Sequence, residues 1–208
     1  MMKIWPSIAS CDQHFLSDEL SFAKDVFGRI HLDIEDGKYL WHFTYDKDQV
    51  EELLKHFDMD CSVHLMVEDP LDYLDVLAFY PCVKIVFMHL EHLANPDKVI
   101  QAYRKRGLTV GLGLSDRNLK AALSPVVLGS VDAYLMLTAA IDDLQQVFSE
   151  ALLDFAHKLS KAYQKELWLD GGIKVEMLES LVNKGIENAI LGRAVFSQKQ
   201  FWKKGGTP

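Results

Sequence analysis

Short apolar segments alternate with segments of helical periodicity along the whole of the 208-residue chain. The alternation repeats about every 25 residues, and eight strand–helix units fill the chain from end to end. It predicts a parallel sheet whose strands are connected through helices. The predicted strands are Lys3–Ala9, Arg29–Ile34, Asp60–Met66, Val83–Met88, Leu108–Leu114, Val131–Leu137, Glu166–Leu169 and Asn188–Leu191.

Helical spacing and helix-start residues place one helix after each strand. The predicted helices are Phe15–Phe27, Asp46–Phe57, a helix opened by Pro70, one from Asn95 that ends before Gly107, Asp116–Leu123, Ile141–Tyr163, Lys174–Asn183 and one over about Ala194–Lys203. We therefore predict a single α/β domain over residues 1–208, folded as a (β/α)8 TIM barrel. A doubly wound open sheet is the alternative, and it is less favoured because eight units use the whole length.

Composition narrows the possible partners and locations. A net charge of −8 and a pI near 5.4 argue against a nucleic-acid partner. Three cysteines without a CxxC pair favour a reducing, cytoplasmic location over a disulfide framework. No apolar run approaches ~20 residues and the N-terminal segment lacks a signal-peptide core, so no membrane partner is expected.

Residues 30–37 alternate between apolar and polar side chains, so His31, Asp33 and Glu35 share one face of the predicted strand. Such a strand usually has one face in water, but a parallel sheet between helices is covered on both faces. Ionisable side chains are costly there unless they are paired, hydrogen-bonded or bound to a metal. The strand ends before Gly37, which places the polar row at its carboxyl end, where barrels of this class carry their chemistry.

Further polar side chains stand in or at the ends of other predicted strands. His64 lies in the third strand, His89 follows the fourth with Glu91 two residues on, and Asp170 follows the seventh. A single histidine on an apolar strand is more often a hydrogen-bonded core residue than a ligand. Two imidazoles and two carboxylates that converge on one barrel mouth instead suit a divalent ion such as Zn²⁺, Fe²⁺, Mn²⁺ or Co²⁺.

Five short motifs are distributed over nearly the whole chain. They are Pro6-Ser7-Ile8, His31-x-Asp33-x-x-Asp36-Gly37, Val63-His64-Leu65-Met66, Asp170-Gly171-Gly172-Ile173 and Leu191-Gly192-Arg193-Ala194-Val195-Phe196. Each motif alone is weakly specific, but together and in this order they resemble the ribulose-phosphate 3-epimerase family. The resemblance implies a ribulose-phosphate-binding (β/α)8 barrel, a bound divalent metal ion, and inversion of the carbon next to the carbonyl of a ketose phosphate.

The same resemblance implies roles for particular residues. It makes the metal ligands His31, Asp33, His64 and Asp170, and it makes Asp33 and Asp170 the acid/base pair. It places Ser7 and His64 at the substrate and gives the phosphate to backbone N–H groups of Gly171, Gly172, Gly192 and Arg193. The expected substrate is a small phosphorylated sugar similar to ribulose 5-phosphate or xylulose 5-phosphate of pentose phosphate metabolism, and a homo-oligomer is expected.

The chemistry also fits these residue types without the family name. Inversion next to a ketone needs a base on one face of the carbon and an acid on the other, and two carboxylates on opposite barrel walls would supply them. An enediolate intermediate needs a fixed positive charge, which a metal ion supplies as a Lewis acid. Gly171-Gly172 permits close backbone approach to an anion, although a tight strand–helix turn explains two glycines equally well.

The sequence departs from the family in the residues expected to bind substrate. The stretch after the sixth strand, residues 137–144, has no glycine and carries Asp142 and Asp143, which would repel a phosphate. Glu35 stands where the family usually has Met, and Arg193 where it usually has Ser. We expect Arg193 to replace the lost phosphate contacts; otherwise it pairs with Glu35 or Asp142 and braces the rim. The simpler interpretation of Glu35 is structural: its carboxylate only pairs with Lys38 or Arg193. These changes resemble a divergent sugar-phosphate epimerase branch.

Two other functions remain open from the sequence. A catalytically inactive sugar-phosphate-binding paralogue would account for the lost loop glycines, although all four predicted ligands are present. A phosphate-binding barrel lyase or decarboxylase would need a lysine near the carboxylates. Lys84 is the only lysine inside a central strand, and the alternation of that strand places it on the face opposite to His89.

Overall fold

The computed structural model of the chain describes residues 2–117, 124–140 and 145–206. Its strands are β1 Lys3–Pro6, β2 Arg29–Glu35, β3 Asp60–Met66, β4 Val83–Met88, β5 Val110–Leu114, β6 Ala133–Leu137, β7 Glu166–Asp170 and β8 Asn188–Leu191. Its helices are α1 Leu16–Phe27, α2 Lys47–His56, α3 Leu74–Phe79, α4 Pro96–Lys105, α5 Pro125–Ser130, α6 Glu150–Tyr163, α7 Leu178–Asn183, α8 Arg193–Phe196 and α9 Lys199–Lys203. No helix within the described residues is both long enough and apolar enough to cross a bilayer.

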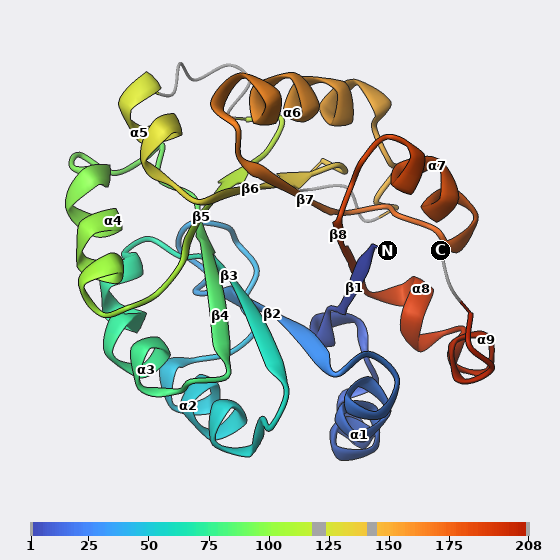
Figure 1. Cartoon of the computed structure of the whole chain (residues 1–208). Coiled ribbons are helices and arrows are strands. Elements are labelled where there is room, and N and C mark those ends of the chain that lie inside the picture. The colour runs from blue at the N-terminus through green and yellow to red at the C-terminus, as the bar shows by residue number, and fades with distance from the viewer. Residues whose placement is uncertain (1, 118–123, 141–144, 207–208) are drawn as a thin grey trace.

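The eight strands form one parallel sheet in the order β1-β8-β7-β6-β5-β4-β3-β2. A further parallel bridge between Ser7 and His31 joins β1 to β2, so the sheet closes on itself. The helices surround the strands on the outside (Figure 1). The predicted (β/α)8 barrel is therefore confirmed, and the open doubly wound sheet is excluded.

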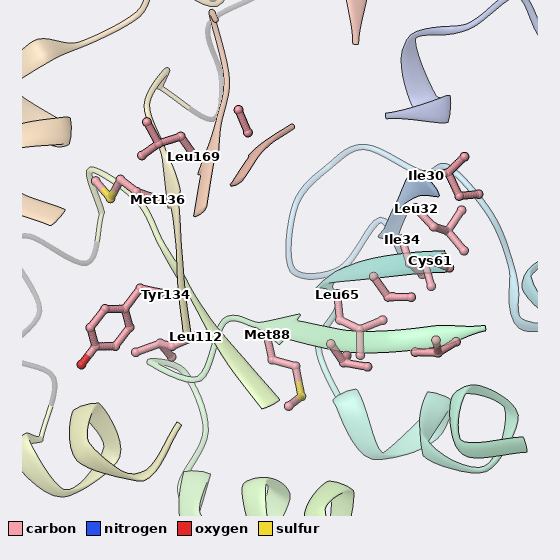
Figure 2. Close-up of a cluster of buried hydrophobic side chains, with 14 of the residues drawn as sticks. Ile30, Leu32, Ile34, Cys61, Leu65, Met88, Leu112, Tyr134, Met136 and Leu169 are labelled. Atoms are coloured by element: carbon pink, nitrogen blue, oxygen red, sulfur yellow. The ribbon is translucent and has the colours of Figure 1, made fainter. Parts of the chain in front are cut away.

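Apolar side chains fill two separate layers because residues along each strand alternate between the two faces of the sheet. Ile30, Leu32 and Ile34 of β2 lie between the sheet and the helices, in a large cluster of which Figure 2 shows part. The second cluster lies on the opposite face of the strands, inside the barrel, and consists of Trp5, Ile85, Phe87, Ala133, Leu135, Trp168 and Ile190. The inner layer thus fills the barrel beneath the carboxyl ends of the strands.

Several predicted elements end or begin elsewhere in the structure, including the first strand and the sixth helix. The first strand stops at Pro6 rather than at Ala9, because residues 8–10 form a 3-10 turn in which the Cys11 N–H bonds to the carbonyl of Ile8. The sixth helix begins at Glu150 rather than at Ile141, and the Ser149 hydroxyl caps it. Residues 141–144 of the predicted helix lie outside the described residues, and residues 146–148, which are not helical, lie next to Gly172 of the following β–α turn.

Other predictions on helices are wrong in detail or fall outside the described residues. Most of the predicted helix at 116–123 lies outside them, as do Asp142 and Asp143, and the structure instead has the unpredicted α5. The predicted helix at 194–203 is two short helices, α8 and α9. In contrast, α2 begins as predicted after Asp46, which forms a capping box with Gln49.

Candidate active site

Four ionisable side chains predicted as ligands meet at the carboxyl end of the barrel. One ligand atom from each of His31, Asp33, His64 and Asp170 lies within 4.8 Å of the others. The first two come from β2, and the others come from β3 and β7. They converge because the alternation along each strand turns them toward the barrel interior, as it does Trp168 two residues before Asp170.

Asp33 lies at the centre of the cluster. Its Oδ1 is 3.1 Å from His31 Nε2 and 3.5 Å from His64 Nδ1, while Ser7 Oγ donates a 2.6 Å hydrogen bond to its Oδ2. Burial opposes ionisation, but the adjacent His31 holds the pKa of Asp33 well below its usual range. Burial would likewise lower the pKa of His31, but Asp33 outweighs it and the pKa is raised. Asp33 is therefore a carboxylate at neutral pH.

Asp170 has the opposite electrostatic character. Burial, reinforced by the negative charge of Asp33, raises its pKa to about 7. Two neighbouring carboxyl groups whose pKa values are driven apart in this way are suited to act as base and acid. The strands that carry them, β2 and β7, are separated by β1 and β8, so the two groups enter from different walls of the mouth but not from diametrically opposite ones.

The cluster fits a divalent metal ion. His64 Nδ1 is buried, faces Asp33 and has no hydrogen-bond partner among the described residues, as expected of a lone pair reserved for a metal. Two imidazoles and two carboxylates are a common donor set for Zn²⁺ and for Fe²⁺, Mn²⁺ or Co²⁺. His31, Asp33, His64 and Asp170 would be the four ligands.

Each imidazole has an outer partner to which the sequence analysis gave no role. His31 Nδ1 is 2.8 Å from Ser62 Oγ, and His64 Nε2 is 3.0 Å from His89 Nε2. Burial lowers the pKa of His64 and, well below its usual value, that of His89, so both rings are neutral. The inward orientation of His89 at the end of β4 was the only signal that could have indicated it.

A cavity of about 640 Å³ opens above the cluster at the barrel mouth. Its lining includes every predicted substrate-binding residue, namely Ser7, His64, Gly171, Gly172, Gly192 and Arg193. It also includes Lys174 and Glu176, which the sequence analysis did not single out. His42 and Glu35 also line the cavity.

The three predicted phosphate-binding glycines are also required by packing. A Cβ on Gly171 would lie 2.9 Å from the backbone nitrogen of Ala139, and one on Gly172 would lie 2.4 Å from the Gln146 carbonyl oxygen. Both glycines have positive φ angles, of 101° and 71°. A Cβ on Gly192 would meet the Ser10 hydroxyl at 2.1 Å. The tight turn and the close approach to an anion are therefore compatible uses of the same residues.

Arg193 and Glu35 do not pair with each other. An Arg193 Nη2 donates to the Gln146 side-chain oxygen at 3.2 Å and to the Gln145 carbonyl at 3.4 Å. Lys38, the other expected partner of Glu35, lies 3.7 Å from Glu68 instead. Burial and the nearby Asp33 raise the pKa of Glu35, which lines the cavity.

Lys84 lies outside the barrel. Its side chain is half exposed, and its Nζ is 3.4 Å from Asp60 Oδ1 rather than near the cluster. The lyase or decarboxylase hypothesis therefore loses the one strand lysine on which it relied.

Comparison with known proteins identifies relatives of this architecture. The sequence profile of the ribulose-phosphate 3 epimerase family matches residues 3–196. The chain is 26% identical over 204 residues to ribulose-phosphate 3-epimerase of Helicobacter pylori, covering 95% of this chain and 92% of that protein. It is 28% identical over 198 residues to the enzyme of the same name from Treponema pallidum, covering 92% and 90%.

A solved structure of the tryptophan synthase α-subunit from Pyrococcus furiosus has the same fold. It superposes with a TM-score of 0.67 at 13% identity, covering 98% of this chain and 94% of the other. At 13% identity that similarity concerns the fold alone, whereas the match of the sequence profile over residues 3–196 concerns the sequence itself. The chain belongs to the ribulose-phosphate 3-epimerase family, a family of sugar-phosphate isomerases.

Proposed function

We propose that this protein is a metal-dependent epimerase that inverts the carbon next to the carbonyl of a ketose phosphate similar to ribulose 5-phosphate or xylulose 5-phosphate. The observation that carries the proposal is the pair formed by Asp33 and Asp170. The two carboxyl groups share one buried cluster, and their pKa values are driven in opposite directions. Membership of the epimerase family supports the same reaction class.

The ionised Asp33 acts as the base on one face of the substrate carbon. It takes the proton, and the electrons of the broken C–H bond move into an enediolate. Asp170, whose pKa burial and Asp33 raise, donates a proton to the same carbon from the other side. The two groups exchange roles in the reverse direction. The hydrogen bond from the Ser7 hydroxyl, 2.6 Å long, fixes the orientation of the Asp33 carboxylate.

A bound divalent ion would supply fixed positive charge to the oxygen atoms of the enediolate. His31, Asp33, His64 and Asp170 would hold it, and it would offset the repulsion between the two carboxylates. Zn²⁺, Fe²⁺, Mn²⁺ and Co²⁺ are all compatible with this donor set. The residues around the cluster exclude water from most of it, since both histidines are completely buried.

The phosphate would lie at the side of the cavity formed by the ends of β7 and β8. Arg193 supplies a cationic group there, whose hydrogen bonds among the described residues go to uncharged acceptors. Its alternative partner Asp142 lies outside the described residues. Lys174 adds a second cation to the cavity lining. Backbone N–H groups of Gly171, Gly172 and Gly192 complete the proposed phosphate site.

A solvent-exchange experiment tests the proposed reaction. The purified protein, loaded separately with each of the four ions, is incubated in D₂O with a panel of ketose phosphates, and the sugars are analysed by NMR. We expect deuterium at the inverted carbon together with formation of the epimer, and no exchange in the metal-free sample. Binding of a sugar phosphate without deuterium incorporation would instead identify an inactive sugar-phosphate-binding paralogue.

A further inference from the structure

His89 lies directly behind a predicted metal ligand. It follows the last residue of β4, and its side chain faces the barrel interior as Phe87 does two residues earlier. Only 1% of the residue is exposed. Its Nε2 is 3.0 Å from His64 Nε2, and the ring centroids are 5.1 Å apart. The two imidazoles therefore share one proton between these nitrogens.

The position of that proton follows from the other nitrogen of His64. His64 Nδ1 faces the cluster at 3.5 Å from Asp33 Oδ1, so it must present a lone pair if it binds an ion. The proton of a neutral His64 ring is then on Nε2, and His89 must accept it through its own Nε2. The proton of His89 is left on Nδ1, which is buried and has no hydrogen-bond partner among the described residues. Glu91 Oε1 lies 3.8 Å from this nitrogen, so the carboxylate attracts the proton without a direct hydrogen bond.

The surroundings hold His89 in the orientation that this arrangement requires. Tyr39 stacks on the imidazole with centroids 5.1 Å apart and planes at 23°. The Tyr39 hydroxyl donates a 2.5 Å hydrogen bond to Glu91 Oε1, which keeps that carboxylate beside the ring. Gly113 leaves room for the ring, since a Cβ at that position would lie 2.8 Å from His89 Nε2.

We propose that His89 is a positioning residue that, together with Glu91 and Tyr39, fixes His64 in the Nε2–H tautomer and thereby presents Nδ1 to the metal ion. The inference rests on the proposed function, because it presupposes that the cluster binds a metal. Outer-shell partners of metal-bound histidines act in this way, and their loss typically weakens metal binding by 10–100-fold. Ser62 serves His31 through a hydroxyl instead, so the two histidine ligands have separate supports.

Metal affinity and the tautomeric state test this role directly. Affinity for Co²⁺ is measured by competition with a chromophoric chelator, and the visible spectrum of bound Co²⁺ reports the ligand geometry. We expect His89→Phe, which fills the space without an acceptor, to weaken Co²⁺ binding by about 10–100-fold. His89→Gln, whose amide oxygen can accept the same proton, should restore binding to within about threefold of wild type.

Phe87→Leu is the matched control, because it disturbs the same strand one layer deeper and leaves the two imidazoles unchanged. An equal loss of affinity in Phe87→Leu at equal loss of stability would reduce His89 to a packing role and overturn the inference. Wild-type affinity in His89→Phe, or equal losses in the Phe and Gln variants, would also overturn it. A wild-type protein that binds none of the four ions would refute the proposed function itself, and the inference with it.

The tautomers are measured without any variant by long-range ¹H–¹⁵N NMR of the wild-type protein loaded with Zn²⁺. We expect His64 to be protonated at Nε2 and His89 at Nδ1. A proton on His89 Nε2 in the loaded protein would contradict the inference even if no His89 variant folds.

Discussion

Gly111 in β5 has no room for a side chain, and Gly111→Ala should therefore destabilise the barrel strongly. A Cβ at this position would lie 2.1 Å and 2.3 Å from two ring carbons of Phe87, its register partner on β4. Phe87 cannot move aside, because it is fully buried and its ring packs at 5.1 Å from that of Trp168. The Trp168 ring in turn packs against the Trp5 ring, with centroids 4.8 Å apart.

The size of the effect follows from two opposing terms. Overpacking of a well-filled core costs about 1–3 kcal/mol, and contacts this short place Gly111→Ala at about 3 kcal/mol. Replacing glycine with alanine also lowers the conformational entropy of the unfolded chain, which offsets about 0.4–1 kcal/mol of this destabilisation. The net loss of about 2 kcal/mol corresponds to a roughly 30-fold decrease in the ratio of folded to unfolded protein.

Urea unfolding followed by tryptophan fluorescence measures this loss. With a slope of about 2 kcal/mol/M, the midpoint should fall by about 1 M without a change in slope. Gly129→Ala is the control, because that glycine lies in α5, is exposed and has no atom within 4 Å of the point where a Cβ would lie. It should stabilise the protein by about 0.5–1 kcal/mol. An unchanged midpoint in Gly111→Ala would refute the account of the inner layer.

Three further predictions concern the site and its surroundings. Asp33→Asn and Asp170→Asn should each lower turnover by at least ~10²-fold at full metal occupancy, and full activity in either loaded variant would remove that residue from the acid/base pair. Arg193→Ser should raise KM for a phosphorylated ketose by about 10–100-fold, since charge-assisted hydrogen bonds contribute roughly 1.5–3 kcal/mol. Equal loss on an unphosphorylated ketose would indicate a structural role at the rim. Burial raises the pKa of the Cys11 thiol to about 11, so its alkylation should accelerate as the pH rises from 8 to 11. Mass spectrometry of the labelled chain measures this, and a rate already at its maximum at pH 8 would contradict it.

The strands and the polar row were predictable because their signals are local. Alternation along β2 separates Ile30 from His31, and the same alternation places Asp33 in the barrel interior. The start of α6 was missed although Ser149 is a capping residue, because helical spacing carried the predicted helix back to Ile141. In the structure the non-helical residues 146–148 lie next to Gly172, which is far away in sequence. Tertiary contacts of this kind override helical periodicity.

The hydrogen-bond partners of the two histidine ligands could not be predicted for a similar reason. The sequence marks His89 as a polar residue after the fourth strand but gives it no partner, and nothing distinguishes Ser62; only the distances to His64 and His31 give these residues a role. The alternative pairing of Arg193 with Glu35 is not formed, and Arg193 donates to the Gln146 side chain instead. Side-chain partners across a barrel mouth depend on the three-dimensional register of strands, which no local pattern records.

The closure of the sheet between β1 and β2 has a mechanical consequence. These neighbours are joined by the single bridge from Ser7 to His31 among the described residues, whereas the other neighbouring strands share longer ladders. Asp170 lies on β7, which is connected to β1 through β8, and Asp33 lies on β2, so the two residues are on opposite sides of this closure. An ion bound by both residues would crosslink the barrel across β1 and β2, the neighbouring strands that share only this one bridge among the described residues. Its removal should accelerate amide hydrogen exchange in β1 and β2 while leaving the amides of β5 and β6 protected.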